Sequence, residues 1–124
     1  MAFTTITANK IIDKILRNTD FVHPGSIYVS LHTGDPGQAG ANEVSGGGYS
    51  RKLVSFAEAA NKRSNNTADL EFTNMPTATV THVGLWSAAS SGNFWWGGSL
   101  TAAKSLTTGD TLRVPANDLD VTLI

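Results

Sequence analysis

The residues whose types and spacing could do chemistry gather in and beside the stretch from His32 to Tyr49, HTGDPGQAGANEVSGGGY. Glycine-rich loops expose backbone N–H groups to anions, so phosphate binding is the first chemistry to test. A P-loop requires Gly-x-x-x-x-Gly-Lys-Ser/Thr, and no lysine follows either glycine cluster here. A dinucleotide fingerprint would open a helix, whereas the residues after Gly48 alternate like a strand. We therefore predict no cofactor site and interpret residues 33–48 as a long loop that becomes ordered against a neighbouring subunit.

Metal binding and catalysis find no support in the residue pattern. His23, His32 and His82 are not at the i, i+2 or i, i+4 spacing that brings two ligands to one metal ion. Asp118 and Asp120 could share a strand face, but no calcium-type acidic loop surrounds them. The chain has no cysteine and no Gly-x-Ser-x-Gly elbow. We predict no catalytic residue and no metal, and a small hydrolase built from distant residues is the last of the alternatives.

The tryptophans offer a different kind of contact. In the run from Phe94 to Trp96, strand alternation places Phe94 and Trp96 on one face and Trp95 on the other. An outward Trp95 could anchor a protein interface, or it could stack on a sugar ring. The third interpretation is that Trp95 packs under the N-terminal helix or the long loop.

One short amphipathic helix is predicted over residues 7–18. Its apolar stripe consists of Ile11, Ile12, Ile15 and Leu16. Thr7 suits the N-cap, and Asn18 suits the C-terminal end, where a left-handed conformation is favoured. The stripe would serve packing on its own domain or on a neighbour equally well.

The rest of the chain has the period-two pattern of strands. In the first strand, Ile27, Val29 and Leu31 face one way and Tyr28, Ser30 and His32 the other. The strands are expected at residues 26–32, 49–56, 69–73, 80–87, 94–100, 111–114 and 119–124. These elements predict a single all-β domain over residues 1–124: an antiparallel β-sandwich or small barrel of about seven strands, jelly-roll-like, with the helix preceding a β-domain at 26–124.

Charge and hydropathy exclude several classes of partner. Nine Lys and Arg against ten Asp and Glu give a formal net charge of −1, without the basic patch expected of a nucleic-acid-binding protein. The N-terminal residues lack the apolar core of a signal peptide, and no apolar run is long enough to span a membrane. We expect no nucleic acid and no membrane as partner, and synthesis in the cytoplasm.

Four segments together resemble a family of small virion proteins of tailed bacteriophages. They are IYVSLHTGDPG from Ile27, NEVSGGGYSR from Asn42, VTHVGLW from Val80, and LTAAKSL from Leu100 with the Gly-Asp-Thr that begins at Gly109. Members of the family are commonly labelled tail fibre proteins, and they are similar to capsid decoration or cement proteins. The resemblance implies a location in the virion and a structural role without catalytic residues.

The resemblance leaves the position on the particle open. A fibre that reaches a receptor usually needs a long shaft, and this sequence has no heptad or other repeat to build one. We therefore predict first a capsid decoration protein bound to the major capsid protein, second a tail fibre, baseplate or tail adaptor protein, and third a host-surface glycan-binding domain. A homo-oligomer, trimer or pentamer, would suit the symmetry of a particle. The predicted partner-binding residues are Asp35, Pro36, Gly37, Glu43, Tyr49 and Trp95.

Overall fold

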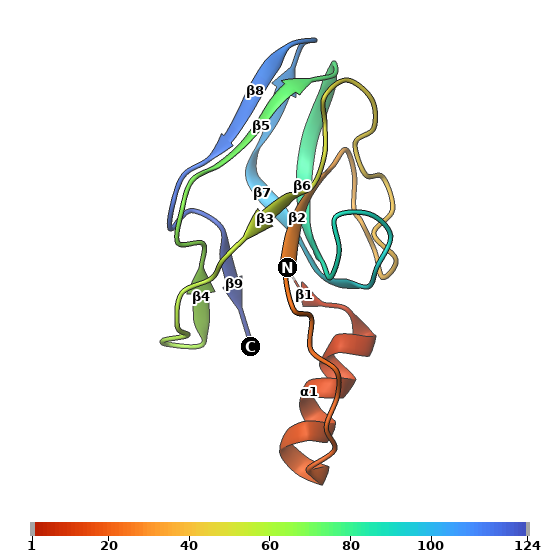
Figure 1. Ribbon diagram of the computed structural model, residues 1–124, viewed down its shortest axis with the longest axis vertical. Helices are drawn as coiled ribbons and strands as arrows, with labels where there is room; N and C mark the ends of the chain where they lie inside the picture. The colour runs from red at the N-terminus through yellow and green to blue at the C-terminus, as the bar shows by residue number, and fades with distance from the viewer. Residues whose placement is uncertain (1, 124) are drawn as a thin grey trace.

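The computed structural model describes residues 2–123, which form a β-domain from which one helix projects (Figure 1). The helix, α1, spans Thr5–Arg17. The strands are β1 (Ala2–Phe3), β2 (Ile27–His32), β3 (Lys52–Val54), β4 (Arg63–Asn65), β5 (Leu70–Met75), β6 (Ala78–Trp86), β7 (Phe94–Leu106), β8 (Asp110–Val114) and β9 (Asp120–Thr122). The predicted all-β class with a single N-terminal helix is confirmed.

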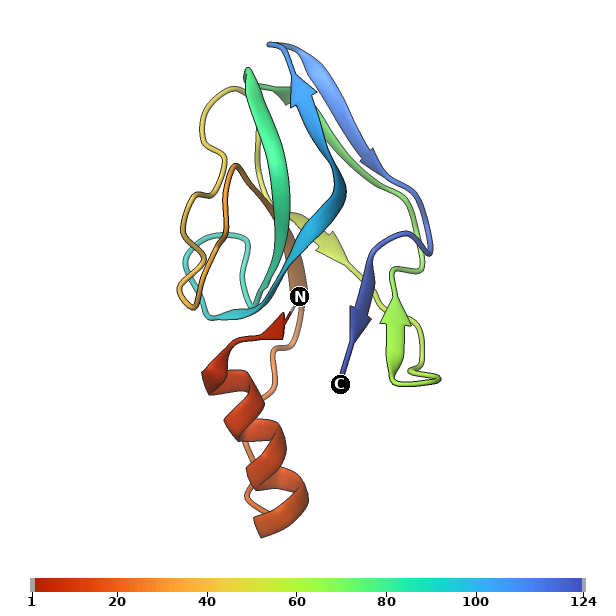
Figure 2. The ribbon, with the colours of Figure 1, turned by 180° about the vertical axis from the view of Figure 1, so that it is seen from behind.

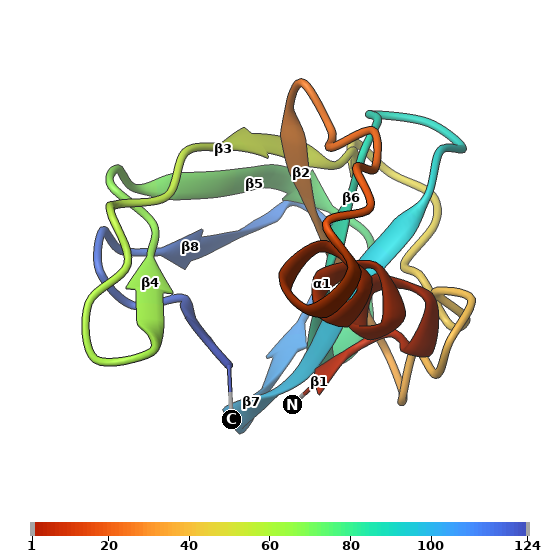
Figure 3. The same cartoon turned by 90° about the horizontal axis from the view of Figure 1, so that it is seen from below.

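The strands form three antiparallel sheets. The largest has five strands in the order β1-β7-β6-β2-β3, while β5 pairs with β8 and β4 pairs with β9. The β5–β8 ribbon lies across from the five-stranded sheet, as the view from below shows (Figure 3). One apolar core lies between these layers, and it includes Leu31 and Trp96 from the large sheet and Phe72 and Leu112 from the ribbon. Burial of such side chains is the main stabilising term of the fold.

Strand β2 differs from its prediction because it is buried on both faces. Val29 and Leu31 enter the core as expected, but Ser30 and His32 on the opposite face are also fully buried. The cover on that face is the segment 33–48, which folds back over the sheet instead of extending from it (Figure 2). Alternation locates such a strand, but it does not show that the second face is covered.

The helix begins two residues before its prediction and ends one residue before it. Thr4, not Thr7, is the N-cap, and its side chain accepts a hydrogen bond from the Thr7 amide. Thr7 is instead the buried side chain of α1. Asn18 closes the helix in the left-handed conformation at φ 50°, as predicted.

Two short strands lie where no strand was expected. β1 pairs with the start of β7 and brings the N-terminal segment to one edge of the large sheet. β4 lies in the predicted turn between residues 60 and 66 and pairs with β9. β7 is longer than predicted, reaching Leu106 across a bulge near Val80 of its partner strand.

Candidate functional site

The segment 33–48 is ordered by hydrogen bonds within its own chain. At its tip, Asp35 Oδ1 accepts from the Gly37 amide at 2.9 Å, and the Pro36 carbonyl accepts from the amides of Gly40 and Ala41 at 2.9 and 2.8 Å. On its return, the Val44 amide donates to the Leu31 carbonyl at 2.9 Å. The segment is therefore a folded loop with a defined tip, and it does not require a neighbouring subunit for its order.

The triple glycine lets the end of this loop pass close to the turn after β5. The Gly48 amide donates to the Asn74 carbonyl at 2.7 Å. At Gly47, φ is +55° and an added Cβ would lie 2.9 Å from the backbone nitrogen of Pro76. Only glycine fits a left-handed position with so close a backbone neighbour.

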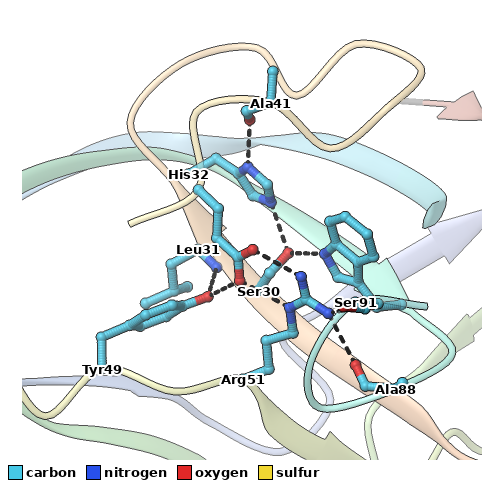
Figure 4. A network of polar contacts seen from close by, with 10 residues as sticks. Ser30, Leu31, His32, Ala41, Tyr49, Arg51, Ala88 and Ser91 are labelled. Carbon is cyan, nitrogen blue, oxygen red and sulfur yellow. Dashed lines mark hydrogen bonds and ion pairs between the residues drawn. The ribbon is translucent and has the colours of Figure 1, made fainter. Parts of the chain in front are cut away.

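A partly buried ion pair between Glu43 and Arg51 fastens the loop to the residue that precedes β3 (Figure 4). Arg51 Nε and Nη2 donate to the two carboxylate oxygens of Glu43, each at 2.9 Å, and the Arg51 side chain is 8% exposed. The hydroxyl of Tyr49 donates to Glu43 Oε2 at 2.7 Å and accepts from the Leu31 amide at 3.1 Å. A bidentate pair with its remaining groups satisfied is a geometry that can compensate the cost of burying the charges.

Arg51 also joins the loop to the segment 87–93. Its Nη1 donates to the carbonyls of Ala88 and Ser91 at 3.0 and 2.8 Å. Its guanidinium lies 3.7 Å from the centre of the Trp86 ring, a cation–π contact. One arginine therefore holds two loops and the end of β6 together.

A second chain of hydrogen bonds runs across the covered face of β2 (Figure 4). Trp86 Nε1 donates to Ser30 Oγ at 2.8 Å, and Ser30 Oγ lies 2.6 Å from His32 Nε2. His32 Nδ1 lies 2.7 Å from the Ala41 carbonyl, which can only accept, so Nδ1 carries the proton and Nε2 accepts from the serine. The neutral imidazole thus links the loop to the sheet.

Burial and hydrogen bonding shift three pKa values in this network. Burial lowers the pKa of His32 below its usual 6.5. Burial alone would raise the pKa of Glu43, but hydrogen bonds from Arg51 and Tyr49 outweigh it and hold that pKa below its ordinary value. Burial, with the hydrogen bond to Glu43, raises the pKa of Tyr49. The loop is consequently held by an ionised glutamate and a neutral histidine.

Five of the six predicted partner-binding residues lie in the loop or directly after it, and they fall into three structural groups. Glu43 and Tyr49 belong to the internal network, and Pro36 is buried against β7, where a Cβ on Gly97 would lie 2.8 Å from Pro36 Cγ. Asp35 and Gly37 are exposed at the tip. Their partner-binding role stays a prediction, and the structure leaves Asp35 and Gly37 as the members of the loop set that are open to a partner.

Trp95 is buried, so its predicted outward position is wrong. It is 8% exposed, and its ring centre lies 6.3 Å from that of Phe21 in the segment after α1. The reason is that the N-terminal segment and the chain after α1 cover this side of β7. The interpretation that Trp95 packs under the N-terminal helix is therefore the one that the structure supports.

Two clefts flank the loop tip. One, of about 410 Å³, lies between the first turns of α1, the residues Gln38 and Ala39, and the segment 92–95. The other, of about 280 Å³, lies between Asp35, Pro36 and the edge formed by β1 and β7. Gln38 borders both clefts, and its side chain accepts a hydrogen bond from the Thr5 amide at 2.7 Å. The tip is therefore a ridge between two hollows.

Sequence reasoning missed the residues that organise this site. Arg51 and Trp86 stood within the family-like segments but were assigned no role, and Ser30 and His32 were placed on an open face. The one available signal was a glutamate and an arginine at opposite ends of the glycine cluster.

Within residues 2–123, the structure shows no group of three or more His, Asp or Glu placed to hold a metal ion. No helix of the described residues is long and apolar enough to cross a membrane.

The described residues thus form a small antiparallel β-domain with an ordered surface loop. The sequence model of the family described as "Podophage GP4 fiber I protein gp80" matches residues 2–122, so the chain belongs to that family. It is therefore a phage fibre-type virion structural protein, and such a protein associates with other virion proteins. Comparison with curated proteins gave no match.

Proposed function

We propose that this chain is a non-enzymatic component of a phage tail fibre, or of its attachment to the tail, that binds other virion proteins through the tip of loop 33–48. The family's description as a fibre protein supports the tail over the capsid as its location. The observation that carries the binding role is the tip itself. Asp35, Gly37 and Gln38 are exposed although the loop beneath them is fixed by hydrogen bonds.

A loop fixed in advance changes how binding would work. A segment that folds only on assembly loses part of its binding free energy to ordering, whereas a preorganised one loses little. The tip and its two clefts would present a ready shape to a partner. A clasp that becomes ordered on assembly, the earlier expectation for this loop, is therefore not part of the proposal.

Capsid decoration is the competing proposal. It is favoured by the compact β-domain, which could occupy many equivalent positions on a shell and bind them with multivalent strength. The glycan-binding alternative relied on an open Trp95 ring, and the burial of Trp95 removes that support.

Immunogold electron microscopy of intact phage, with antibodies against the purified chain, tests the location. Label confined to the tail is the expected result, and regular label over the head would replace the fibre proposal with decoration. Because the antibodies report position only, this experiment does not depend on which surface makes the contact.

The binding surface is tested with a charge reversal at the tip. Asp35→Arg combined with Gln38→Arg removes only two exposed hydrogen bonds, from the amides of Gly37 and Thr5, so it should leave the domain folded and strongly reduce its incorporation into particles. Glu71→Arg, on exposed β5, is the matched control and should be incorporated normally. Normal incorporation of the tip variant would show that the partner binds elsewhere.

A further inference from the structure

Helix α1 projects from the β-domain (Figures 1 and 2). Most of its apolar side chains are exposed. Ile12, Ile15 and Leu16 are 53%, 76% and 76% exposed, and Thr7 is the only buried side chain of the helix. A free helix of 13 residues is marginal in water, and its stability in proteins comes mostly from packing of an apolar face. Ala8 and Ile11 at its edge are partly buried, but Ile12, Ile15 and Leu16 remain exposed within residues 2–123.

The exposed face is too short to be a heptad repeat, but over residues 8–16 it has the spacing of a helix-bundle seam. Ala8, Ile12 and Ile15 follow one another at intervals of four and three, so they occupy heptad positions d, a and d. Ile11 and Leu16 flank this seam at g and e. Isoleucine at both a and d favours three or four helices over two. Apolar g and e positions fit the same arrangement, because each helix then contacts two neighbours.

The charges of α1 all lie away from this seam. Lys10, Asp13, Lys14 and Arg17 occupy positions f, b, c and f, so identical helices can meet without bringing like charges together. The chain's own return segment also lies on the polar side. Lys14 pairs with Asp20, and the ammonium of Lys10 lies 6.0 Å from the centre of the Phe21 ring. The seam therefore faces away from the rest of the molecule.

We propose that α1 is the self-association element of this protein, and that it packs against the same helix of other copies in a parallel bundle of three or four. Closed rotational symmetry makes the helices parallel, with every β-domain at the same end of the bundle. The inference deepens the proposed function, since it names a second copy of the chain as one partner within the virion. It places self-association on α1 and leaves the tip of loop 33–48 for a different protein.

An amphipathic helix of this kind can also lie on a membrane, but the charges of α1 argue against that occupant. Surface helices of membranes carry free cations on their polar face. Here Lys14 and Arg17 are each paired with a carboxylate of the same chain, Asp20 and Asp13. The face itself holds isoleucine and leucine, without the tryptophan or phenylalanine common at such interfaces.

Sedimentation of the purified full chain over a range of concentrations tests the proposal. The wild type should form a single trimer or tetramer, and Ile12→Asp with Ile15→Asp should be a folded monomer. Lys10→Asp with Arg17→Asp changes the same helix on its polar side, away from the seam, and should associate like the wild type. Wild type that stays monomeric overturns the proposal, and so does a face variant that still associates. Wild type that stays monomeric but binds vesicles of phosphatidylethanolamine and phosphatidylglycerol would assign the face to a membrane instead.

Disulfide crosslinking gives an independent readout, because the chain has no cysteine of its own. Ile12→Cys places thiols at the centre of a parallel bundle, where two identical positions meet. Lys14→Cys places them on the outside as the matched control. Rapid covalent dimers from Ile12→Cys but not from Lys14→Cys are expected, and equal rates would overturn the bundle. Neither test uses particles, so a wrong tail location and a wrong bundle are distinguishable.

Discussion

Loop 33–48 and helix α1 are both long segments outside the strands of the β-domain. They differ in whether their side chains find contacts within the same chain. The loop returns to its own domain, where Glu43 meets Arg51 and Val44 enters the core. The helix keeps its cap, its ion pairs and its return segment on one side and leaves Ile15 and Leu16 in water. Thus the loop that was expected to need a neighbouring subunit is held by its own chain. The helix, whose apolar stripe suited its own domain or a neighbour equally well, leaves most of that stripe uncovered within residues 2–123.

The difference shows that a polar segment and an apolar segment place different demands on the contacts within one chain. A buried polar group must find a partner within reach, so the loop network has to be complete in the isolated chain. An exposed apolar face carries no such demand, and it can remain uncovered until another chain arrives. Substitutions in the loop should therefore act on the stability of one chain, whereas those on the helix face should act on association.

The largest effect is expected from Arg51→Ala. The variant leaves the carboxylate of Glu43 without its partner and removes the bonds to the carbonyls of Ala88 and Ser91. Breaking a buried ion pair costs about 3 kcal/mol of unfolding free energy, which urea denaturation measures. Arg63→Ala is the control, because Arg63 is exposed and lies 4.0 Å from Asp120, and it should cost less than about 0.5 kcal/mol. Similar costs for the two arginines would mean that the loop is not held by this pair.

An effect of comparable size is expected from Gly40→Ala. At Gly40, φ is +76°, and an added Cβ would lie 2.3 Å from Cζ2 of Trp86. Overpacking of this kind costs about 2 kcal/mol, and a left-handed alanine adds about 1 kcal/mol. Gly37→Ala separates the two contributions, because φ there is +61° but nothing lies within 4 Å. If Gly40→Ala and Gly37→Ala lose equal stability in thermal unfolding, the backbone at Gly40 is not closely packed against Trp86.

The sequence predicts local features of this molecule well. The helix is found within two residues of its ends, because Asn18 and the isoleucine spacing act within one or two turns. β2, β6 and β8 are found because their apolar residues alternate. These signals depend on neighbours in the chain, and one sequence contains them in full.

The features that sequence reasoning missed depend on residues far apart in the chain. Arg51 bonds to a carbonyl 40 residues away, and Trp86 bonds to Ser30 56 residues away. β4 consists of Arg63, Ser64 and Asn65, and only its pairing with β9 makes it a strand. The burial of Trp95 likewise requires knowing that the chain after α1 returns over β7. Tertiary contacts of this kind override local patterns.

A pH-dependent effect of intermediate size is expected from His32. Burial lowers the pKa of His32 in the folded state below 6.5, so the unfolded chain binds more protons as the pH falls below that value. Its contribution to stability is complete above pH 6.5 and decreases with acidification, by at most about 1.4 kcal/mol per pH unit. The charged or titratable groups that act on it are Glu43, Arg51 and His82.

Urea denaturation at pH values above and below 6.5 measures this dependence. His32→Gln should be less stable than the wild type at neutral pH and should show a shallower loss on acidification. His23→Gln, at an exposed position, should keep the slope of the wild type. An unchanged slope in His32→Gln would assign the acid sensitivity to other groups.

The smallest effect on a single chain is expected from Leu16→Ala. Leu16 is 76% exposed, so in dilute solution its truncation should change the unfolding free energy by less than about 0.5 kcal/mol. Leu31→Ala is the same substitution at a fully buried position and should cost about 3 kcal/mol. As protein concentration rises, the unfolding free energy of the wild type should increase because its chains associate. The unfolding free energy of the Leu16 variant should increase less, because its association is weaker. The Leu31 deficit should not grow in that way. A large cost of Leu16→Ala in dilute solution would mean that the helix face is already covered within one chain, and the contrast with the loop would disappear.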